Sequence, residues 1–294
     1  MATVVQWIQG ARPRTLPTAV SPVLVGTGAA AGDGVVAPGA AALALLVAVA
    51  LVIGVNFAND YSDGIRGTDD DRVGPVRLVG SKAAAPAAVR TAALLSFGVA
   101  GLAGLALVAL SGQWWLLVVG ALCIAGAWFY TGGKRPYGYA GLGEVAVFVF
   151  FGPVAVLGTV LTQSGSPGPL AVVASIAVGM LTCAVLVANN LRDIPTDAVV
   201  GKRTLAVLLG ETDTRRLYVA LVGAPFLFSA AAGLLRSWPL LIALLAVPLA
   251  VLPAAAVLRG AAGRALVTVL GQTGMLLLAW SVLTAVGLVW GRFG

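Results

Sequence analysis

The fold is decided by the stretch Gly168–Asp197, which reads GPLAVVASIAVGMLTCAVLVANNLRDIPTD. Its first part, residues 168–190, carries no charged side chain. A helix of about 20 mostly apolar residues is long enough to cross a bilayer, so this part predicts a membrane-spanning helix. The polar cluster that follows, Asn189 to Asp197, is costly at the end of a membrane helix, and such residues are usually functional. One stretch therefore predicts both the class of fold and the place of a site.

Apolar runs of the same kind recur along the whole chain. They give nine candidate spans, at about residues 15–32, 39–58, 91–111, 114–131, 140–162, 168–190, 216–234, 238–258 and 265–290. Pro17 and Pro22 interrupt the first span, but proline is tolerated in membrane helices. We therefore predict an all-α, polytopic membrane protein in which about nine transmembrane helices form a single domain over residues 1–294.

The composition excludes several classes of protein. Hydrophobic residues make up 60% of the 294 residues and charged residues 10%, whereas a typical soluble domain is about 25% charged. A disordered chain, a nucleic-acid-binding domain and a disulfide-rich secreted scaffold are therefore excluded. The chain has no histidine, which removes the commonest general base and zinc ligand.

The net charge of +7 mostly reflects membrane topology. Of the 18 Lys and Arg residues, 16 lie in the N-terminal segment or in the second, fourth, sixth and eighth loops, and Arg236 and Arg292 lie on the other side. The positive-inside rule then predicts a cytoplasmic N-terminus and an external C-terminus. Of the 11 acidic residues, Asp33 alone falls on the external side. We therefore expect a cell-membrane protein whose chemistry takes place on its cytoplasmic face.

The acidic cluster at 189–197 has helical spacing. Asn189, Asp193 and Asp197 are four residues apart, so a continuing helix would place all three on one face. Pro195 opposes this arrangement, because proline ends or kinks a helix near the preceding residue, here Ile194.

A related cluster follows the second predicted span and reads NFANDYSDGIRGTD, residues 56–69. It contains two Asn-x-x-x-Asp pairs, Asn56 with Asp60 and Asn59 with Asp63. The spacing leaves open which pair takes part in chemistry. Gly67 stands where a third acid would continue the spacing, and Asp69 in the following loop is its candidate replacement.

Carboxylates and amides at two helix ends are suited to one kind of chemistry. They supply hard oxygen ligands for Mg²⁺, whose coordination is commonly completed by substrate phosphates. Two such clusters can hold metal ions around a diphosphate, while Lys and Arg side chains bind its outer oxygens. Metal ions of this kind neutralise a leaving diphosphate. The alternative is that the acids are solvated charges that pair with nearby arginines, and we favour it for Asp70, Asp71, Glu211 and Asp213.

The two clusters lie about 130 residues apart, each after an apolar span. This recurrence predicts an internal duplication into two four-helix halves, about 15–131 and 140–258, with the ninth helix appended. Membrane proteins built from repeats commonly place their site at the interface between the repeats. We therefore expect the clusters to contribute to one site.

These residues also resemble a known family. Two segments are similar to the aspartate-rich motifs of the UbiA superfamily of intramembrane prenyltransferases: NDYSD at 59–63 with GTD at 67–69, and RDIPTDAVVGK at 192–202. The resemblance extends over nearly the whole chain. Three stretches look like those of the branch that prenylates 1,4-dihydroxy-2-naphthoate: RPRTLP at 12–17, NFANDYSDG at 56–64 and NNLRD at 189–193.

The resemblance implies a bundle of nine helices around a central cavity that opens to the cytoplasm and laterally to lipid. It implies Mg²⁺ as the cofactor, held by oxygen atoms from both motifs. The implied metal ligands are Asn59, Asp60, Asp63, Asp69, Asn189, Asp193 and Asp197, and the acids Asp60, Asp63, Asp193 and Asp197 among them are the implied catalytic residues. The implied substrate-binding residues are Asn59, Arg77, Lys134, Arg135, Tyr139, Asn189, Asn190 and Lys202.

Three of these assignments have alternatives. Lys134 and Arg135 are equally well explained as anchors at the inner face of the membrane. Tyr139 is either an interfacial residue or a base for the reaction. Glu144 lies inside a predicted span, and its partner cannot be inferred from the sequence.

The resemblance further implies an activity in menaquinone biosynthesis. A polyprenyl group would pass from a polyprenyl diphosphate to 1,4-dihydroxy-2-naphthoate, a bicyclic aromatic acid, with loss of CO₂ and diphosphate, giving demethylmenaquinone. One alternative is a different acceptor: 4-hydroxybenzoate, homogentisate or a phosphoribose diphosphate. Another is a secondary transporter, because repeats and acids at helix ends fit that class too. The expected partners are these substrates and membrane lipid, without nucleic acid, and neither prenyl chain length nor oligomeric state can be inferred.

Overall fold

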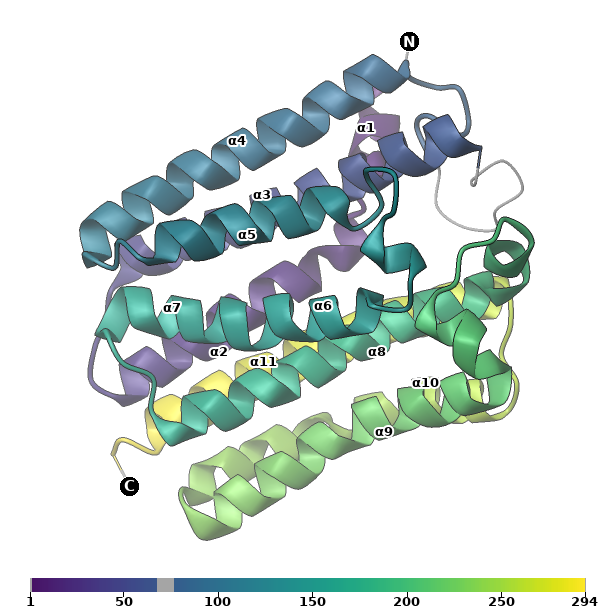
Figure 1. Ribbon diagram of the computed structural model, residues 1–294. Helices are drawn as coiled ribbons and strands as arrows, with labels where there is room; N and C mark the ends of the chain where they lie inside the picture. Colours follow the sequence, from purple (N-terminus) through teal and green to yellow (C-terminus); the bar gives the residue numbers. More distant parts are fainter. Residues whose placement is uncertain (1, 68–76, 294) are drawn as a thin grey trace.

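A computed structural model describes residues 2–67 and 77–293, and all regular secondary structure in these ranges is helical (Figure 1). The predicted all-α class is therefore confirmed. The first helices are α1 (Val4–Gly10), α2 (Leu16–Gly32), α3 (Pro38–Arg66), α4 (Pro86–Ser111) and α5 (Leu116–Phe129). α6 (Gly143–Val149) continues through a π-helical segment, Phe150–Val154, into α7 (Ala155–Ser164). The remaining elements are α8 (Pro169–Val199), α9 (Leu205–Leu235), a 3-10 helix at Trp238–Ala246 that leads into α10 (Val247–Leu258), and α11 (Arg264–Trp290).

Seven helices within the described ranges are long and apolar enough to cross a membrane. They are α3, α4, α6 with α7, α8, α9, the 3-10 helix with α10, and α11. α2 and α5 are shorter, with 17 and 14 residues. A helix occupies each of the nine predicted ranges, so the multi-pass membrane architecture is confirmed. The number of crossings and the side of the N-terminus stay predictions.

α3 and α8 extend past the spans predicted for them. α3 runs to Arg66 rather than residue 58, and α8 runs to Val199 rather than residue 190. The predicted ends follow the loss of apolar residues, whereas backbone hydrogen bonding continues for about two further turns. α3 ends where Gly67 adopts a left-handed φ of 71°, the usual C-terminal cap of a helix.

Pro195 lies inside α8 and does not end it. Proline removes one backbone hydrogen bond, and the other bonds of this 31-residue helix carry the chain past that point. Of the two expected effects, an end or a kink near Ile194, the end is therefore wrong. As a result, Asn189, Asp193 and Asp197 all belong to one helix.

α9 also begins earlier than predicted, at Leu205 rather than residue 216. Thr204 caps the new end, because the backbone N–H of Val207 donates to its hydroxyl at 3.4 Å. Gly210, with φ of 74°, then interrupts the helical conformation. The polar stretch at 211–216 separates the apolar residues 205–209 from the long apolar run, which is why the prediction misses the first turns.

α8 is the central helix of the bundle. It has the largest buried share of any spanning helix, 67% of its most apolar 18-residue window. It packs against α9, α11, α6 and the π-helical segment, while α3 packs against α4 on the far side of the bundle (Figure 1). The main apolar cluster joins Val178 and Leu181 of α8 to Leu277 and Trp280 of α11.

The C-terminal ends of α3 and α8 and the segment after α5 lie at one end of the bundle (Figure 1). Arg66, the last residue of α3, donates hydrogen bonds to the carbonyl oxygens of Thr131 and Gly133 in the segment after α5. The backbone N–H of Arg203, after α8, donates to the carbonyl of Tyr139 at 3.0 Å. Both acidic clusters therefore end on the same side, as expected, while the division into two four-helix halves stays a prediction.

Candidate active site

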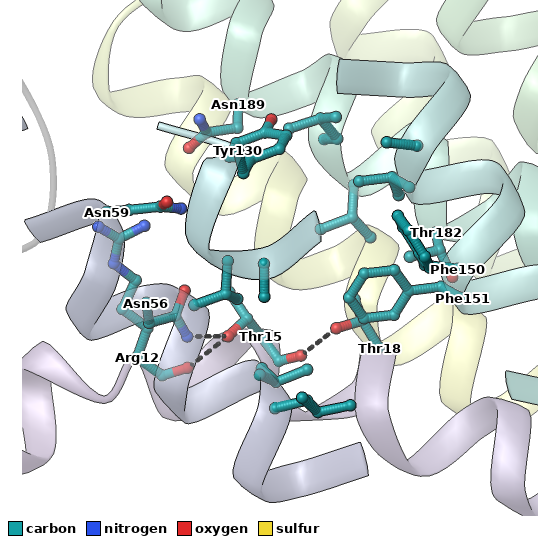
Figure 2. A pocket seen from close by; sticks show the side chains of 18 of the residues that line it. Arg12, Thr15, Thr18, Asn56, Asn59, Tyr130, Phe150, Phe151, Thr182 and Asn189 are labelled. Atoms are coloured by element: carbon teal, nitrogen blue, oxygen red, sulfur yellow. Dashed lines mark hydrogen bonds between the residues drawn. The ribbon is translucent and has the colours of Figure 1, made fainter. Parts of the chain in front are cut away.

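A cavity of about 240 Å³ lies among α2, α3, α5, α6, the π-helical segment and α8 (Figure 2). Its wall is mostly apolar, and Phe150 and Phe151 are neighbours in sequence that both line it. Both residues lie in the π-helical turn, and such turns are frequent at functional sites. Its polar lining residues come mainly from the ends of α3 and α8 and the segments after them: Asn56, Asn59, Asp63, Arg77, Asn189, Asn190 and Lys202.

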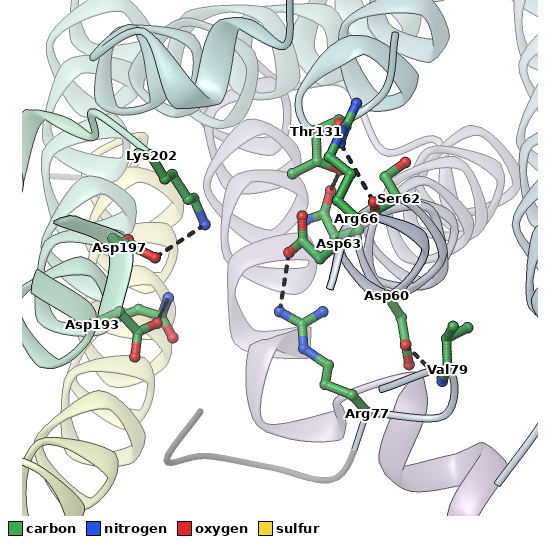
Figure 3. A network of polar contacts seen from close by, with 12 residues as sticks. Asp60, Ser62, Asp63, Arg66, Arg77, Val79, Thr131, Asp193, Asp197 and Lys202 are labelled. Carbon is green, nitrogen blue, oxygen red and sulfur yellow. Dashed lines mark hydrogen bonds and ion pairs between the residues drawn. The ribbon is translucent and has the colours of Figure 1, made fainter. Parts of the chain in front are cut away.

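Asp63 of α3 lies on the cavity wall and is 2% exposed. Its Oδ1 accepts a hydrogen bond from the hydroxyl of Tyr139 at 2.6 Å, and its Oδ2 lies 3.5 Å from Nη2 of Arg77 (Figure 3). One turn earlier, Oδ1 of Asn59 accepts a hydrogen bond from Oγ1 of Thr131 at 2.8 Å. Asn59 and Asp63 thus both line the cavity. The groups around them are two hydroxyls, of Thr131 and Tyr139, and the guanidinium of Arg77.

Asp60 lies in a different environment from Asp63. Its Oδ2 accepts a hydrogen bond from the backbone N–H of Leu78 at 2.7 Å, and its Oδ1 accepts one from Val79 at 3.0 Å. It is 1% exposed and is not among the described residues that line the cavity. Both carboxylate oxygens are therefore taken up by backbone N–H groups, and the expected role of Asp60 as a metal ligand stays a prediction. The position expected for Asp69 lies outside the described residues.

The acids of α8 are each paired with a cation. Asp193 accepts hydrogen bonds from Nε and Nη2 of Arg192 at 2.7 and 2.8 Å, and the same guanidinium donates to Oδ1 of Asn189 at 2.9 Å. Asp197 lies 3.7 Å from Nζ of Lys202 (Figure 3). Lys202 returns toward α8 after the turn at Gly201, whose φ is 73°. The second cluster is therefore oxygen-rich and balanced in charge. Among the described residues it reaches the cavity wall through Asn189, Asn190 and Lys202, while Asp193 and Asp197 are buried behind that wall.

The segment between α5 and α6 connects the two clusters. The ring of Tyr139 lies 5.0 Å from Nζ of Lys202, while its hydroxyl contacts Asp63. Lys134 and Arg135 of the same segment are exposed and are not among the described cavity residues. Their position favours the alternative role as membrane anchors over substrate binding.

Two further tyrosines of this segment have raised pKa values. Burial raises the pKa of Tyr137 to about 12, and its hydroxyl donates to the carbonyl of Gly126 at 2.6 Å. Burial also raises the pKa of Tyr130, and the nearby Glu144 adds to the effect. Both line the cavity. Both hydroxyl groups therefore stay protonated at neutral pH.

Glu144 has a partner that the sequence did not reveal. Nδ2 of Asn190 donates a hydrogen bond to Oε1 of Glu144 at 2.9 Å, and these residues are 5% and 6% exposed. Within the described residues, Oε2 of Glu144 has no hydrogen-bond partner. Because Asn190 lines the cavity, a buried carboxylate sets the orientation of an amide on the cavity wall.

The donor set suits Mg²⁺. Within the described residues, no three acidic or sulfur ligands are close enough to hold a metal ion by themselves. Mg²⁺ usually binds through one or two carboxylates, with waters and substrate phosphates completing its shell. Asp63, Asp193 and Asp197 are buried carboxylates, each beside a cation that is itself able to bind phosphate. The residues therefore fit a metal ion that arrives together with a diphosphate.

Comparison with known proteins identifies the family. The model of the UbiA prenyltransferase family matches residues 19–275. The chain belongs to this family. A 1,4-dihydroxy-2-naphthoate octaprenyltransferase of Mycobacterium tuberculosis is 56% identical over 292 residues, 99% of each chain. A protein of the same name from Escherichia coli is 41% identical over 222 residues, which cover 74% of this chain and 72% of the relative.

Solved structures of UbiA homologs share the fold. The apo structure of a homolog from Aeropyrum pernix K1 has a TM-score of 0.69 at 17% identity, and the match covers 93% of this chain and 97% of that one. A homolog from Archaeoglobus fulgidus, solved bound to DMAPP and Mg²⁺, has a TM-score of 0.63 at 13% identity, with 96% and 99% covered. The helical arrangement is therefore that of the UbiA family.

In this UbiA family member, sequence reasoning did not assign a site role to Arg12, Tyr130 or Glu144. Arg12 lines the cavity with a left-handed φ of 55°, between α1 and α2 (Figure 2). Its signal is the RPRTLP stretch, in which two cations precede a proline-interrupted span. The signal for Glu144 is its position as an acid inside an otherwise apolar span. Tyr130 carries no signal that separates it from an interfacial tyrosine.

Proposed function

We propose that this protein transfers a polyprenyl group from a polyprenyl diphosphate to 1,4-dihydroxy-2-naphthoate, with loss of CO₂ and diphosphate. The product is demethylmenaquinone, formed in its quinol state. The observation that carries the proposal is the 56% identity, over 99% of both chains, to the naphthoate octaprenyltransferase of Mycobacterium tuberculosis. The cavity supports it, because a mostly apolar wall suits a prenyl chain and a charged end suits a diphosphate.

The cations at the charged end would bind the diphosphate. Arg77 and Lys202 both line the cavity, from opposite clusters (Figure 3). Arg12 adds a third cation from the segment before α2. A guanidinium can bind phosphate oxygens in a bidentate manner, while an ammonium acts as a point charge. We expect Arg77 and Lys202 to leave their carboxylate partners, Asp63 and Asp197, for the diphosphate when it binds.

Asn59, Asp63, Asn189, Asp193 and Asp197 would hold Mg²⁺. When bound, the metal neutralises the charge that develops on the leaving diphosphate. The ligands come from both α3 and α8, so each helix would contribute to the same diphosphate. The homolog bound to DMAPP and Mg²⁺ supports this combination of metal and prenyl diphosphate.

The bond changes balance without a histidine. The bond between C1 of the prenyl chain and the diphosphate oxygen breaks, and its electron pair leaves with the diphosphate. The ring carbon that bears the carboxylate then attacks C1, and the bond to the carboxylate breaks to release CO₂ and return its pair to the ring. The apolar wall, including Phe150 and Phe151, keeps water from the electrophilic carbon.

The charged end of the cavity would face the cytoplasm of a cell-membrane protein. The C-terminal ends of α3 and α8 and the segment after α5 lie there (Figure 1), and the chain around them carries several cations, among them Arg66, Arg77, Lys134, Arg135, Lys202 and Arg203. The positive-inside rule favours a cytoplasmic position for such segments. The active site would then receive soluble substrates from the cytoplasm, and the prenyl chain from the bilayer.

The experiment is product analysis by mass spectrometry with the purified full-length protein in detergent or vesicles. We expect an adduct of octaprenyl diphosphate with 1,4-dihydroxy-2-naphthoate that has lost CO₂, and no adduct with 4-hydroxybenzoate or homogentisate. Chelation by EDTA should abolish turnover and added Mg²⁺ should restore it. A prenylated product from another acceptor alone would contradict the acceptor, and substrate transport without any covalent product would contradict the enzyme.

A further inference from the structure

Asp60 holds the chain backbone at Leu78 and Val79. Its two carboxylate oxygens accept hydrogen bonds of 2.7 and 3.0 Å from consecutive backbone N–H groups (Figure 3). Asp63 follows one turn later on the same helix but points to the cavity (Figure 3). Two neighbouring acids of one motif therefore have different environments, one on backbone N–H groups and one on the cavity wall.

The held segment is also packed closely against α3. Leu78 is fully buried and Val79 is 8% exposed. A Cβ on Gly64 would lie 2.4 Å from Cγ1 of Val79, so a side chain there would displace the segment. Leu78 lies similarly against Gly10, where a Cβ would be 2.8 Å from its Cδ1. The segment therefore packs closely against α3 at Gly64 and against α1 at Gly10, and Asp60 binds its backbone.

Arg77 immediately precedes this held pair of residues. Its carbonyl oxygen accepts hydrogen bonds from the backbone N–H of Ser81 at 3.0 Å and from its hydroxyl at 2.5 Å. Its guanidinium lines the cavity and lies 3.5 Å from Asp63. The backbone that carries Arg77 is thus fixed on its C-terminal side, and this places the guanidinium at the charged end of the cavity.

We propose that Asp60 is a positioning residue for Arg77 rather than a metal ligand. By holding the N–H groups of Leu78 and Val79, it presents the guanidinium of Arg77 to the prenyl diphosphate. The inference rests on the proposed function, because it assigns the diphosphate to Arg77. It divides the first acidic motif into two tasks: Asp63 serves the metal and diphosphate, and Asp60 places the cation that meets them.

The first test measures the held backbone directly, by hydrogen–deuterium exchange of the peptides that contain Leu78 and Val79. In Asp60→Asn the side-chain amide accepts from one N–H and directs its own donors at the other. We expect faster exchange at these two amides. Asp213→Asn, at an exposed ion pair with Arg216, is the matched control and should leave exchange there unchanged. Unchanged exchange in Asp60→Asn would contradict the proposal even if activity changed.

The second test separates positioning from metal binding by kinetics. Asp60→Asn should raise the KM for prenyl diphosphate about tenfold, because a hydrogen bond to a charged group is lost. The KM for the acceptor and the Mg²⁺ concentration for half-maximal rate should stay at wild-type values. Asp63→Asn should instead raise the Mg²⁺ requirement. A raised Mg²⁺ requirement in Asp60→Asn, with an unchanged KM, would identify Asp60 as a ligand and overturn the proposal.

A double variant tests whether Asp60 acts through Arg77. Arg77→Met should raise the KM for prenyl diphosphate at least as much as Asp60→Asn does. If Asp60 acts through Arg77, the double variant is no worse than Arg77→Met alone. If the two residues act independently, the two increases multiply, and the proposal fails.

A variant that leaves Asp60 intact tests the same proposal if Asp60→Asn fails to fold. Gly64→Ala adds a methyl group against Val79, and should reproduce the KM effect and the faster exchange. Gly98→Ala, on α4 with no atom within 4 Å of its Cβ position, should change neither. An inactive wild-type protein would contradict the proposed function, whereas the exchange measurement would still decide whether Asp60 holds the segment.

Discussion

The hydroxyl of Tyr139 donates a hydrogen bond of 2.6 Å to Oδ1 of Asp63. The ring of the same side chain lies 5.0 Å from Nζ of Lys202, a residue that follows α8. One tyrosine thus contacts a group from each of the two acidic clusters. Because its backbone carbonyl also accepts a hydrogen bond from Arg203, it ties the two clusters together at the charged end of the cavity.

Removing the hydroxyl of Tyr139 should weaken the site without unfolding it. Tyr139→Phe keeps the ring beside Lys202 and loses the bond to Asp63. Hydrogen bonds to charged groups contribute about 1.5–3 kcal/mol, so kcat/KM for prenyl diphosphate should fall at least about tenfold. Tyr218→Phe is the control, because the hydroxyl of Tyr218 is bonded to Thr273 in the core. Equal kcat/KM in Tyr139→Phe and wild type would contradict a role for this bond.

Removing the ammonium of Lys202 should weaken binding of the diphosphate. Lys202→Met leaves Asp197 without this cation and removes a charge from the cavity wall. We expect the KM for prenyl diphosphate to rise about tenfold or more, and Lys202→Arg to keep part of the affinity because the charge remains. Arg216→Met removes an exposed ion pair, which contributes about 0–1 kcal/mol, and should leave the KM unchanged. A similar KM in all three variants would rule out diphosphate binding by Lys202.

The buried pair of Glu144 and Asn190 should show energetic coupling. Asn190→Leu removes the hydrogen bond to Glu144 and leaves a buried carboxylate without a donor, which should cost about 1–3 kcal/mol of stability. In a Glu144→Leu background the same substitution should cost much less, because replacing both partners by apolar groups is often nearly neutral. Thermal unfolding in detergent measures both costs, and equal costs in the two backgrounds would show that the pair is not coupled.

Two glycines of the span from α6 to α7 should respond differently to alanine. A Cβ on Gly152 would lie 2.6 Å from the carbonyl oxygen of Ser175 and 2.9 Å from Cα of Gly179, so it would force apart the contact with α8. Overpacking of this kind costs about 1–3 kcal/mol. A Cβ on Gly158 meets nothing within 4 Å, and alanine there should be neutral or gain up to about 1 kcal/mol from helix propensity. A lower melting temperature for Gly158→Ala than for Gly152→Ala would contradict this packing.

Several features of the site were predictable because they are local. Apolar runs of membrane length predict helices, and polar clusters at their ends predict where those helices leave the bilayer. The distribution of lysines and arginines predicts that the segments after α3 and α8 share one side. The recurrence of the clusters predicts one shared site, and Asn59, Asp63, Asn189 and Lys202 do line one cavity.

Other features depend on how helices rotate and pack. The four-residue spacing is satisfied equally by Asn56 with Asp60 and by Asn59 with Asp63, so spacing cannot select between them. The rotation of α3 against its neighbours places Asp63 on the cavity and Asp60 on the backbone of Leu78 and Val79. The partner of Glu144, 46 residues away, depends on contacts between α6 and α8 in the same way.

The sequence by itself determined an all-α membrane protein with two acidic clusters at one end, because hydrophobic length and charge position act locally along the chain. The tertiary structure decided which acid of the first cluster lines the cavity, which cation accompanies each acid, and how far each helix continues past its apolar part. These outcomes depend on the relative rotation of packed helices, and packing energies between residues distant in the chain set that rotation.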